Sequence, residues 1–259
     1  MMRPWSTAWG ISLPIDELSI VNLSSTWLLL PAVALVLGAV LSSRINISEK
    51  SRSALQHLAA GVITAAVAAD LVPEMVGVAK IPALIIGFSI GTALVLLLKF
   101  FGSDEQDSDD AVSEPGQVFG LLGVVGVDLF IDGLLVGIAI VVSGSGAVLG
   151  IAISIETLAL GLAIGATLSH GRVKFRRILV LMLLLAGVLL VGGVIGLMAT
   201  SSFTGDIKTA VIAFGAAALL YLVVEELLVE AHKTGDTTIG SLLFFVGFGG
   251  GVILASVGE

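Results

Sequence analysis

The chain is a succession of long apolar runs, and these runs limit its fold more than any other feature of the sequence. Eight of them have the length at which a helix crosses a bilayer, about 20 residues. We place these runs at residues 27–43, 54–74, 82–98, 117–141, 146–169, 178–199, 209–231 and 238–257. The sequence therefore predicts an all-α polytopic membrane protein with eight transmembrane helices.

Composition excludes most other classes of protein. Only 12% of the residues are charged and 57% are hydrophobic, whereas a soluble domain has about 25% charged residues. The chain contains no cysteine, which excludes disulfides and thiolate metal sites. Twelve Lys and Arg residues in all are too few to form the basic surface that nucleic-acid binding requires. The expected surroundings are therefore a lipid bilayer, with no nucleic-acid partner.

The basic residues predict the orientation of the helices, because cytoplasmic loops are enriched in Lys and Arg. With the N-terminus outside, nine of the twelve fall in inside loops. These are Arg44, Lys50, Arg52, Lys99, Arg172, Lys174, Arg176, Arg177 and Lys233; Arg3, Lys80 and Lys208 fall outside. Since the number of spans is even, both termini are expected on the outer side of the cell membrane.

Two polar segments divide the chain. Residues 1–26 form an N-terminal extracytoplasmic segment, which is no signal peptide because Asp16 and Glu17 interrupt it. Its Trp5 and Trp9 suit a membrane interface, and a disordered tail is the alternative. Helices 1–3 occupy 27–98 and helices 4–8 lie within 117–259.

The connection at 99–116 is an acidic cytoplasmic loop. Its six acids are Asp104, Glu105, Asp107, Asp109, Asp110 and Glu114. Such a run is typical of a solvated linker, and a metal-collecting or regulatory loop is the functional alternative. The loop separates three helices from the next two, and three more follow, so the predicted arrangement is 3+2+3.

A short internal similarity, which we call the internal echo, indicates a repeat. The segment AADLVPEM at 68–75 aligns with VEELLVEA at 224–231 and pairs Asp70 with Glu226 and Glu74 with Glu230. These segments end predicted helices 2 and 7, which run in opposite directions. An inverted repeat of helices 1–3 and 6–8 around a central pair is typical of transporters. Chance similarity over eight residues is the alternative.

Three acids lie inside the predicted fourth and fifth helices. Asp128 and Asp132 share one helix face, one turn apart, and Glu156 lies at a similar depth on the neighbouring helix. A charge at this depth costs about 2.5–3.5 kcal/mol, and the interiors of the predicted helices contain no Lys or Arg. The three acids therefore hold protons, face water or bind a cation. Carboxylates suit Mn²⁺ and Mg²⁺ and accept Zn²⁺ or Fe²⁺, so these three acids are the candidate metal ligands.

Other polar residues near the helix ends suggest a pathway to and from this site. Asp70 and Glu74 are expected at the outer mouth. The inner mouth is expected to contain Glu225, Glu226, Glu230 and His232. His57 and His170 also fall at inner helix ends, where an interfacial role is the simpler interpretation. His232 is the likeliest ligand of the three because it follows two of these acids.

Two motifs resemble those of the ZIP (Zrt/Irt-like) metal transporter family. Residues 128–133, DLFIDG, resemble the His-Asn-x-x-(Asp/Glu)-Gly motif of its fourth span, and residues 156–161, ETLALG, resemble the His/Gln-x-x-Pro-Glu-Gly motif of its fifth. Residues 70–74, DLVPE, resemble the end of its second span. Asp128, Leu129 and Leu160 replace the family's His, Asn and Glu. These departures imply one metal site in place of the paired-metal centre.

The resemblance implies a transporter that carries divalent metal ions into the cytoplasm, with zinc as the family default and manganese or iron as alternatives. It also implies a homodimer and an elevator-like movement of helices 1, 4, 5 and 6 against helices 2, 3, 7 and 8. No catalysis and no cofactor are expected. A transport-dead metal sensor or a proton-linked carrier of another substrate is the alternative. An intramembrane aspartyl hydrolase is disfavoured, because Asp128 and Asp132 lie on one helix and not on facing helices.

Overall fold

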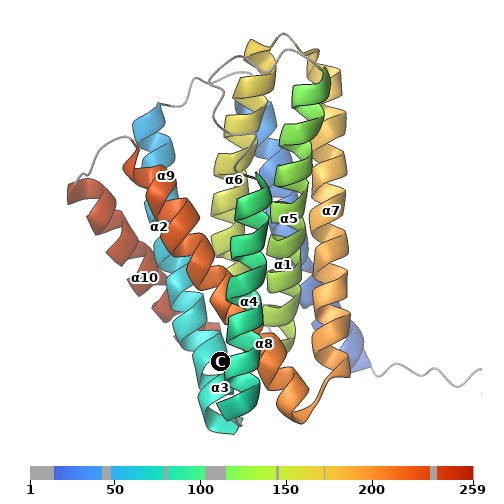
Figure 1. The fold of residues 1–259 in the computed structure, drawn as a ribbon, viewed down its shortest axis with the longest axis vertical. Helices are drawn as coiled ribbons and strands as arrows, with labels where there is room; N and C mark the ends of the chain where they lie inside the picture. Colours follow the sequence, from blue (N-terminus) through green and yellow to red (C-terminus); the bar gives the residue numbers. More distant parts are fainter. Residues whose placement is uncertain are drawn as a thin grey trace, which may run out of the picture.

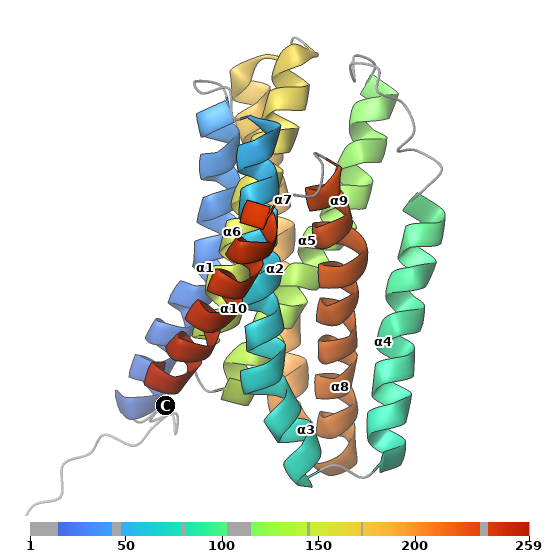
Figure 2. The ribbon, with the colours of Figure 1, turned by 90° about the vertical axis from the view of Figure 1, so that its left-hand side faces the viewer.

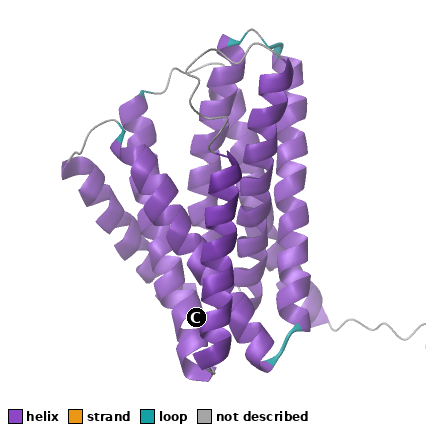
Figure 3. Cartoon of the chain, in the orientation of Figure 1, coloured by secondary structure: helices purple, strands orange, loops and turns teal. Residues whose placement is uncertain are grey.

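The computed structural model describes residues 15–42, 48–78, 81–102, 115–143, 146–171, 173–233 and 238–258. Within these ranges the chain is helical with short turns and contains no strand (Figure 3), which confirms the all-α class. Trp5, Trp9 and the six acids of the predicted cytoplasmic loop lie outside the described residues.

Ten α-helices and two π-helical turns make up the described chain. They are α1 (Ile15–Ser42), α2 (Glu49–Ala66), η1 (Val67–Leu71), α3 (Val72–Val78), α4 (Ile81–Gly102), α5 (Pro115–Ser143), α6 (Ala147–His170), α7 (Phe175–Ser202), α8 (Gly205–Tyr221), η3 (Leu222–Leu227), α9 (Leu228–His232) and α10 (Thr238–Gly258). The π-helical turn η1 joins α2 to α3, and η3 joins α8 to α9. Each of these joined segments is therefore one long helix with a wider turn inside it.

Six helical segments are long and apolar enough to cross a membrane. They are Glu49–Val76, Leu122–Val142, Ala147–Ser169, Phe175–Ser202, Gly205–His232 and Thr238–Val257. Two further helices, α1 and α4, contain shorter apolar stretches at Thr26–Ser42 and Ile81–Leu97. The chain is therefore a multi-pass membrane protein.

Helix α1 begins before its apolar stretch. It starts at Ile15, so residues 15–26 of the predicted N-terminal segment are helical, and its apolar stretch runs from Thr26 to Ser42. Helical hydrogen bonding does not depend on an apolar sequence, and the helix extends beyond the apolar run that predicted it. Consecutive long helices run in alternating directions, and the start of α1 and the end of α10 lie at the same end of the bundle (Figures 1 and 2).

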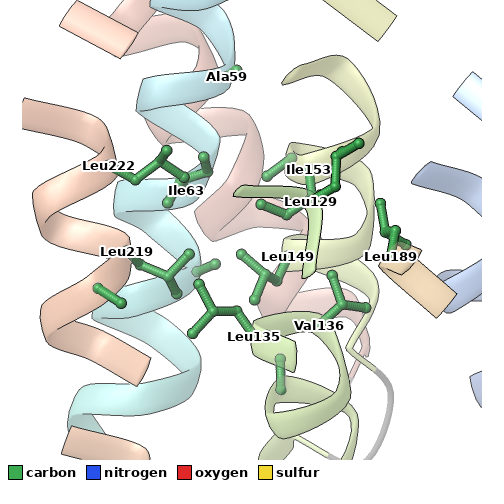
Figure 4. Close-up of a cluster of buried hydrophobic side chains, with 14 of the residues drawn as sticks. Ala59, Ile63, Leu129, Leu135, Val136, Leu149, Ile153, Leu189, Leu219 and Leu222 are labelled. Atoms are coloured by element: carbon green, nitrogen blue, oxygen red, sulfur yellow. The ribbon is translucent and has the colours of Figure 1, made fainter. Parts of the chain in front are cut away.

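The helices form two groups, which we call the inner group (α1, α5, α6 and α7) and the flanking group (α2–α3, α4, α8–α9 and α10). The closest pairs within them are α5 with α7, α1 with α6, α2 with α10 and α4 with α8. Between the groups, the most extensive contact is that of α2 with α6. Buried aliphatic side chains of α2, α5, α6, α8 and η3 meet in one cluster at this junction (Figure 4).

Glycines allow the closest helix pairs to approach backbone to backbone, as small residues do in membranes. A Cβ atom added at Gly133 on α5 would collide with the carbonyl of Leu189 on α7. A Cβ at Gly192 on α7 would collide with the carbonyl of Phe130 on α5. The α5–α7 contact is therefore reciprocal, with glycine on both sides.

We expect Gly192→Ala to destabilise the fold by about 1–3 kcal/mol, because an overpacked contact must separate the two backbones. Gly187→Ala is the matched control on the same helix, since a Cβ there finds no atom within 4 Å. It should leave stability unchanged or raise it by up to about 1 kcal/mol, the helix preference of Ala over Gly. Thermal unfolding of both variants in detergent measures the difference. Equal melting temperatures would contradict the close α5–α7 contact.

Candidate functional site

The three acids of the predicted metal site lie where α5 and α6 face the flanking group. Asp132 is 1% exposed and Glu156 is 7% exposed, whereas Asp128, one turn earlier on α5, is half-buried. Leu129, which lies between the two aspartates in the sequence, is fully buried in the apolar core. Figure 4 shows this leucine beside Ile153 of α6, so it packs the helices together.

These acids interact electrostatically with one another and with a fourth acid. Asp128 interacts with Asp132, and Glu156 interacts with both. Glu226, on the π-helical turn η3, interacts with all three. The sequence placed Glu226 at the inner mouth of the pathway; the structure brings it within electrostatic reach of the buried acids. The site therefore combines three acids of the inner group with one of the flanking group, and we call it the four-acid site.

Two oxygen atoms at the four-acid site lack a hydrogen-bond partner. Asp132 Oδ2 and Glu156 Oε2 are buried, and neither receives a hydrogen bond from the described residues. An unsatisfied buried polar group costs about 1–3 kcal/mol, and a charged group costs more. No Lys or Arg lies on α5 or α6. A proton or a cation would remove this cost.

The four-acid site is not a closed metal-ligand cage. Among the residues that the structure describes, no three or more His, Cys, Asp or Glu side chains are arranged to hold a metal ion. The carboxylates would have to converge on a cation to bind it. Asp128, Asp132 and Glu156 therefore remain predicted ligands.

The two π-helical turns each carry an acid of the predicted pathway. Asp70 lies in η1, and Glu225 and Glu226 lie in η3. The internal echo in the sequence, which pairs Asp70 with Glu226, aligns these two turns. The turn η1 contacts both α5 and α8. Widened turns of this kind are frequent at functional sites.

The remaining pathway residues lie away from the four-acid site. Glu74 is half-buried on α3. Glu230 on α9 forms ion pairs with Arg52 at 2.7 Å and with Lys233 at 2.6 Å. Arg52 reaches it because the start of α2 packs against α9.

His232 also has an unexpected neighbour. Its ring contacts that of His57 on α2, with ring centres 5.1 Å apart. The sequence predicts an interfacial role for His57, and the 174 residues between the two histidines carry no signal of this contact. His170 ends α6, and its side chain lies outside the described part of the structure.

Comparison with known proteins assigns the chain to no family. No protein-family model matches it, and no curated protein is significantly similar to it in sequence.

Proposed function

We propose that this protein is a membrane transporter that moves a divalent metal cation into the cytoplasm through the four-acid site. One observation carries the proposal. Acids from two helix groups interact electrostatically, two of their oxygens are buried without a hydrogen-bond partner among the described residues, and α5 and α6 carry no Lys or Arg. Carboxylate oxygens are ligands for divalent cations, and a bound cation would offset two of these charges and give the two buried oxygens a partner.

The arrangement of the helices supports an elevator-like mechanism. The inner group supplies Asp128, Asp132 and Glu156, and the flanking group supplies Glu226. If the inner group slides as a unit, it carries three ligands with the cation and leaves Glu226 behind. The glycine-lined contacts within each group keep each one together, while aliphatic side chains form the junction between the groups.

The helix pairing also supports the inverted 3+2+3 repeat. Exchanging α1 with α7, α2 with α8, α4 with α10 and α5 with α6 converts each of the four closest pairs into another of the four. The same exchange relates η1 to η3. Under this proposal α1 and α4 complete a set of eight spans, and the basic loops put both termini outside the cell membrane.

These features agree with the resemblance to the ZIP family, which we retain as part of the proposal together with its homodimer. The ion is zinc by that resemblance, whereas an all-carboxylate site also suits manganese or iron. A second candidate is a metal sensor or a proton-linked carrier that moves no metal. The absence of a ready metal cage among the described residues favours this alternative, because protons could satisfy the same oxygens.

We expect purified protein in proteoliposomes to take up Zn²⁺, Mn²⁺ or Fe²⁺ with saturable kinetics. The flux is measured with a fluorescent indicator inside the vesicles or as radioactive isotope retained by the vesicles, and empty liposomes provide the background. Mutual competition between the ions would identify one shared site. Metal binding by calorimetry without flux would support the sensor, and proton movement without metal flux would support the proton-linked carrier.

A further inference from the structure

Two histidines that are far apart in the sequence meet where α2, α9 and α10 come together. The ring of His57 lies edge-to-face with that of His232, at an interplanar angle of 72°. His57 is 2% exposed, whereas His232 is exposed at the end of α9. The pair belongs wholly to the flanking group, and neither ring is among the groups that interact with Asp128, Asp132 or Glu156.

Hydrogen bonds to the main chain fix the tautomer of both rings. His57 Nδ1 lies 2.8 Å from the carbonyl oxygen of Ser53, and His232 Nδ1 contacts the carbonyl oxygen of Leu228. Since a carbonyl oxygen only accepts, each Nδ1 must donate its proton. In the neutral rings each Nε2 is then the nitrogen that carries the lone pair. This is the arrangement of metal-bound histidines, whose second nitrogen donates to a carbonyl or carboxylate.

The buried nitrogen of His57 lacks a partner. His57 Nε2 is inaccessible to solvent and receives no hydrogen bond from the described residues. A buried lone pair without a partner is unfavourable. A metal ion bound to this nitrogen would accept the lone pair.

The separation of the rings fits one shared ion. Two imidazoles bound to one tetrahedral ion through nitrogen, at metal–nitrogen distances of about 2.0–2.1 Å, have ring centres about 5 Å apart. The observed separation is 5.1 Å. The ring separation therefore agrees with one ion held between the two rings.

Contacts between α2, α9 and α10 keep the histidine pair in place. Ser53 Oγ donates to the carbonyl of Ala231 at 2.7 Å and fixes α2 to α9. Arg52 and Lys233 are both bound to Glu230, so their charges are partly compensated. A Cβ at Gly240 of α10 would lie 2.8, 2.9 and 3.1 Å from Cε1, Nε2 and Nδ1 of His57. These similar distances place Gly240 over the face of the ring, so the close approach of α10 needs glycine there.

We infer that His57 and His232 bind one divalent transition-metal ion through their Nε2 atoms, with water in the remaining coordination positions. Imidazole suits Zn²⁺, Cu²⁺ and Ni²⁺, whereas Mg²⁺ and Ca²⁺ prefer oxygen ligands. The histidine site therefore favours transition-metal ions over Mg²⁺ and Ca²⁺ more strongly than the four-acid site, which is made of carboxylates. The inference does not depend on the proposed transport activity.

Copper electron paramagnetic resonance tests the site, because it detects nitrogen ligands directly. The full-length protein in detergent is given less than one equivalent of Cu²⁺. We expect nitrogen hyperfine splitting from two imidazoles in the wild type. We expect His232→Gln to remove that pattern and to weaken Cu²⁺ binding at least tenfold, since loss of even an outer partner of a metal site costs about 10–100-fold. Because His232 is exposed, this variant should fold normally, and His57→Gln provides the second test.

The chain contains three histidines, so His170→Gln is the matched control and should keep the two-nitrogen spectrum. Asp132→Asn should keep it too, which separates this result from any failure of the four-acid site. Size-exclusion chromatography checks the fold of every variant. The inference is overturned if the wild type shows no imidazole ligation, or if ligation persists unchanged in His232→Gln.

Discussion

Asp132→Asn is expected to lower divalent-cation uptake into proteoliposomes at least 100-fold, a loss of about 2.7 kcal/mol. Asparagine keeps the shape of the side chain and removes its charge. Asp132 is the most deeply buried of the four acids, at 1% exposed, and its charge is therefore the least screened by water. A cation at the four-acid site would lose one full negative charge and one strong oxygen ligand. Initial rates at saturating and subsaturating ion concentrations give the change.

The control for this substitution is Asp206→Asn, because Asp206 is exposed in the first turn of α8. Uptake by this variant should equal that of the wild type. In cation-free buffer Asp132→Asn should unfold at the same temperature as the wild type or higher, since it removes a buried charge. A well-folded Asp132→Asn protein with normal uptake would refute transport through the four-acid site.

The helices were predictable from the sequence because the bilayer imposes one length on an apolar run. Every predicted span coincides with a helix, although the structure confirms membrane-crossing length and hydropathy for six of them. Prediction was weakest where the run is not apolar, as at the start of α1. The π-helical turns were also missed, because a single widened turn leaves the apolar pattern nearly unchanged.

The three central acids were predictable because a carboxylate inside an apolar run is conspicuous and costly. Their fourth neighbour, Glu226, was assigned to the inner mouth because it lies near the end of the predicted seventh helix. It lies within the turn η3. The widened turn changes the direction in which later side chains point, and the electrostatic contact of Glu226 with Asp128 follows from tertiary structure.

The contacts of Arg52 with Glu230 and of His57 with His232 were not predictable for a different reason. Each joins α2 to α9, and in each contact the two partners lie more than 170 positions apart in the sequence. Neither partner alone departs from what is normal at a helix end near the membrane surface. The internal echo indicated that the long helices of α2 and α8 correspond, but correspondence under an inverted repeat does not specify which side chains meet.

Joining α5 to α8 should stop transport completely if the inner group slides past the flanking group. A Cβ at Gly215 of α8 would lie 3.4 Å from Cδ2 of Leu135 on α5, so this pair connects the two groups. The chain has no native cysteine, and the double variant Gly215→Cys/Leu135→Cys therefore offers only the intended thiols. A short bifunctional thiosulfonate should link them and abolish uptake, and a reducing agent should restore it.

The matched control links two helices within the inner group. A Cβ at Gly126 of α5 would lie 3.7 Å from Cδ2 of Leu185 on α7, so Gly126→Cys/Leu185→Cys places a similar pair at a similar distance. Its cross-link should leave uptake unchanged, because both helices move together in an elevator. If both links stop uptake, local distortion is the cause. If neither does, with linkage verified by mass spectrometry, α5 does not slide past α8, and the cation must pass between helices that stay in place.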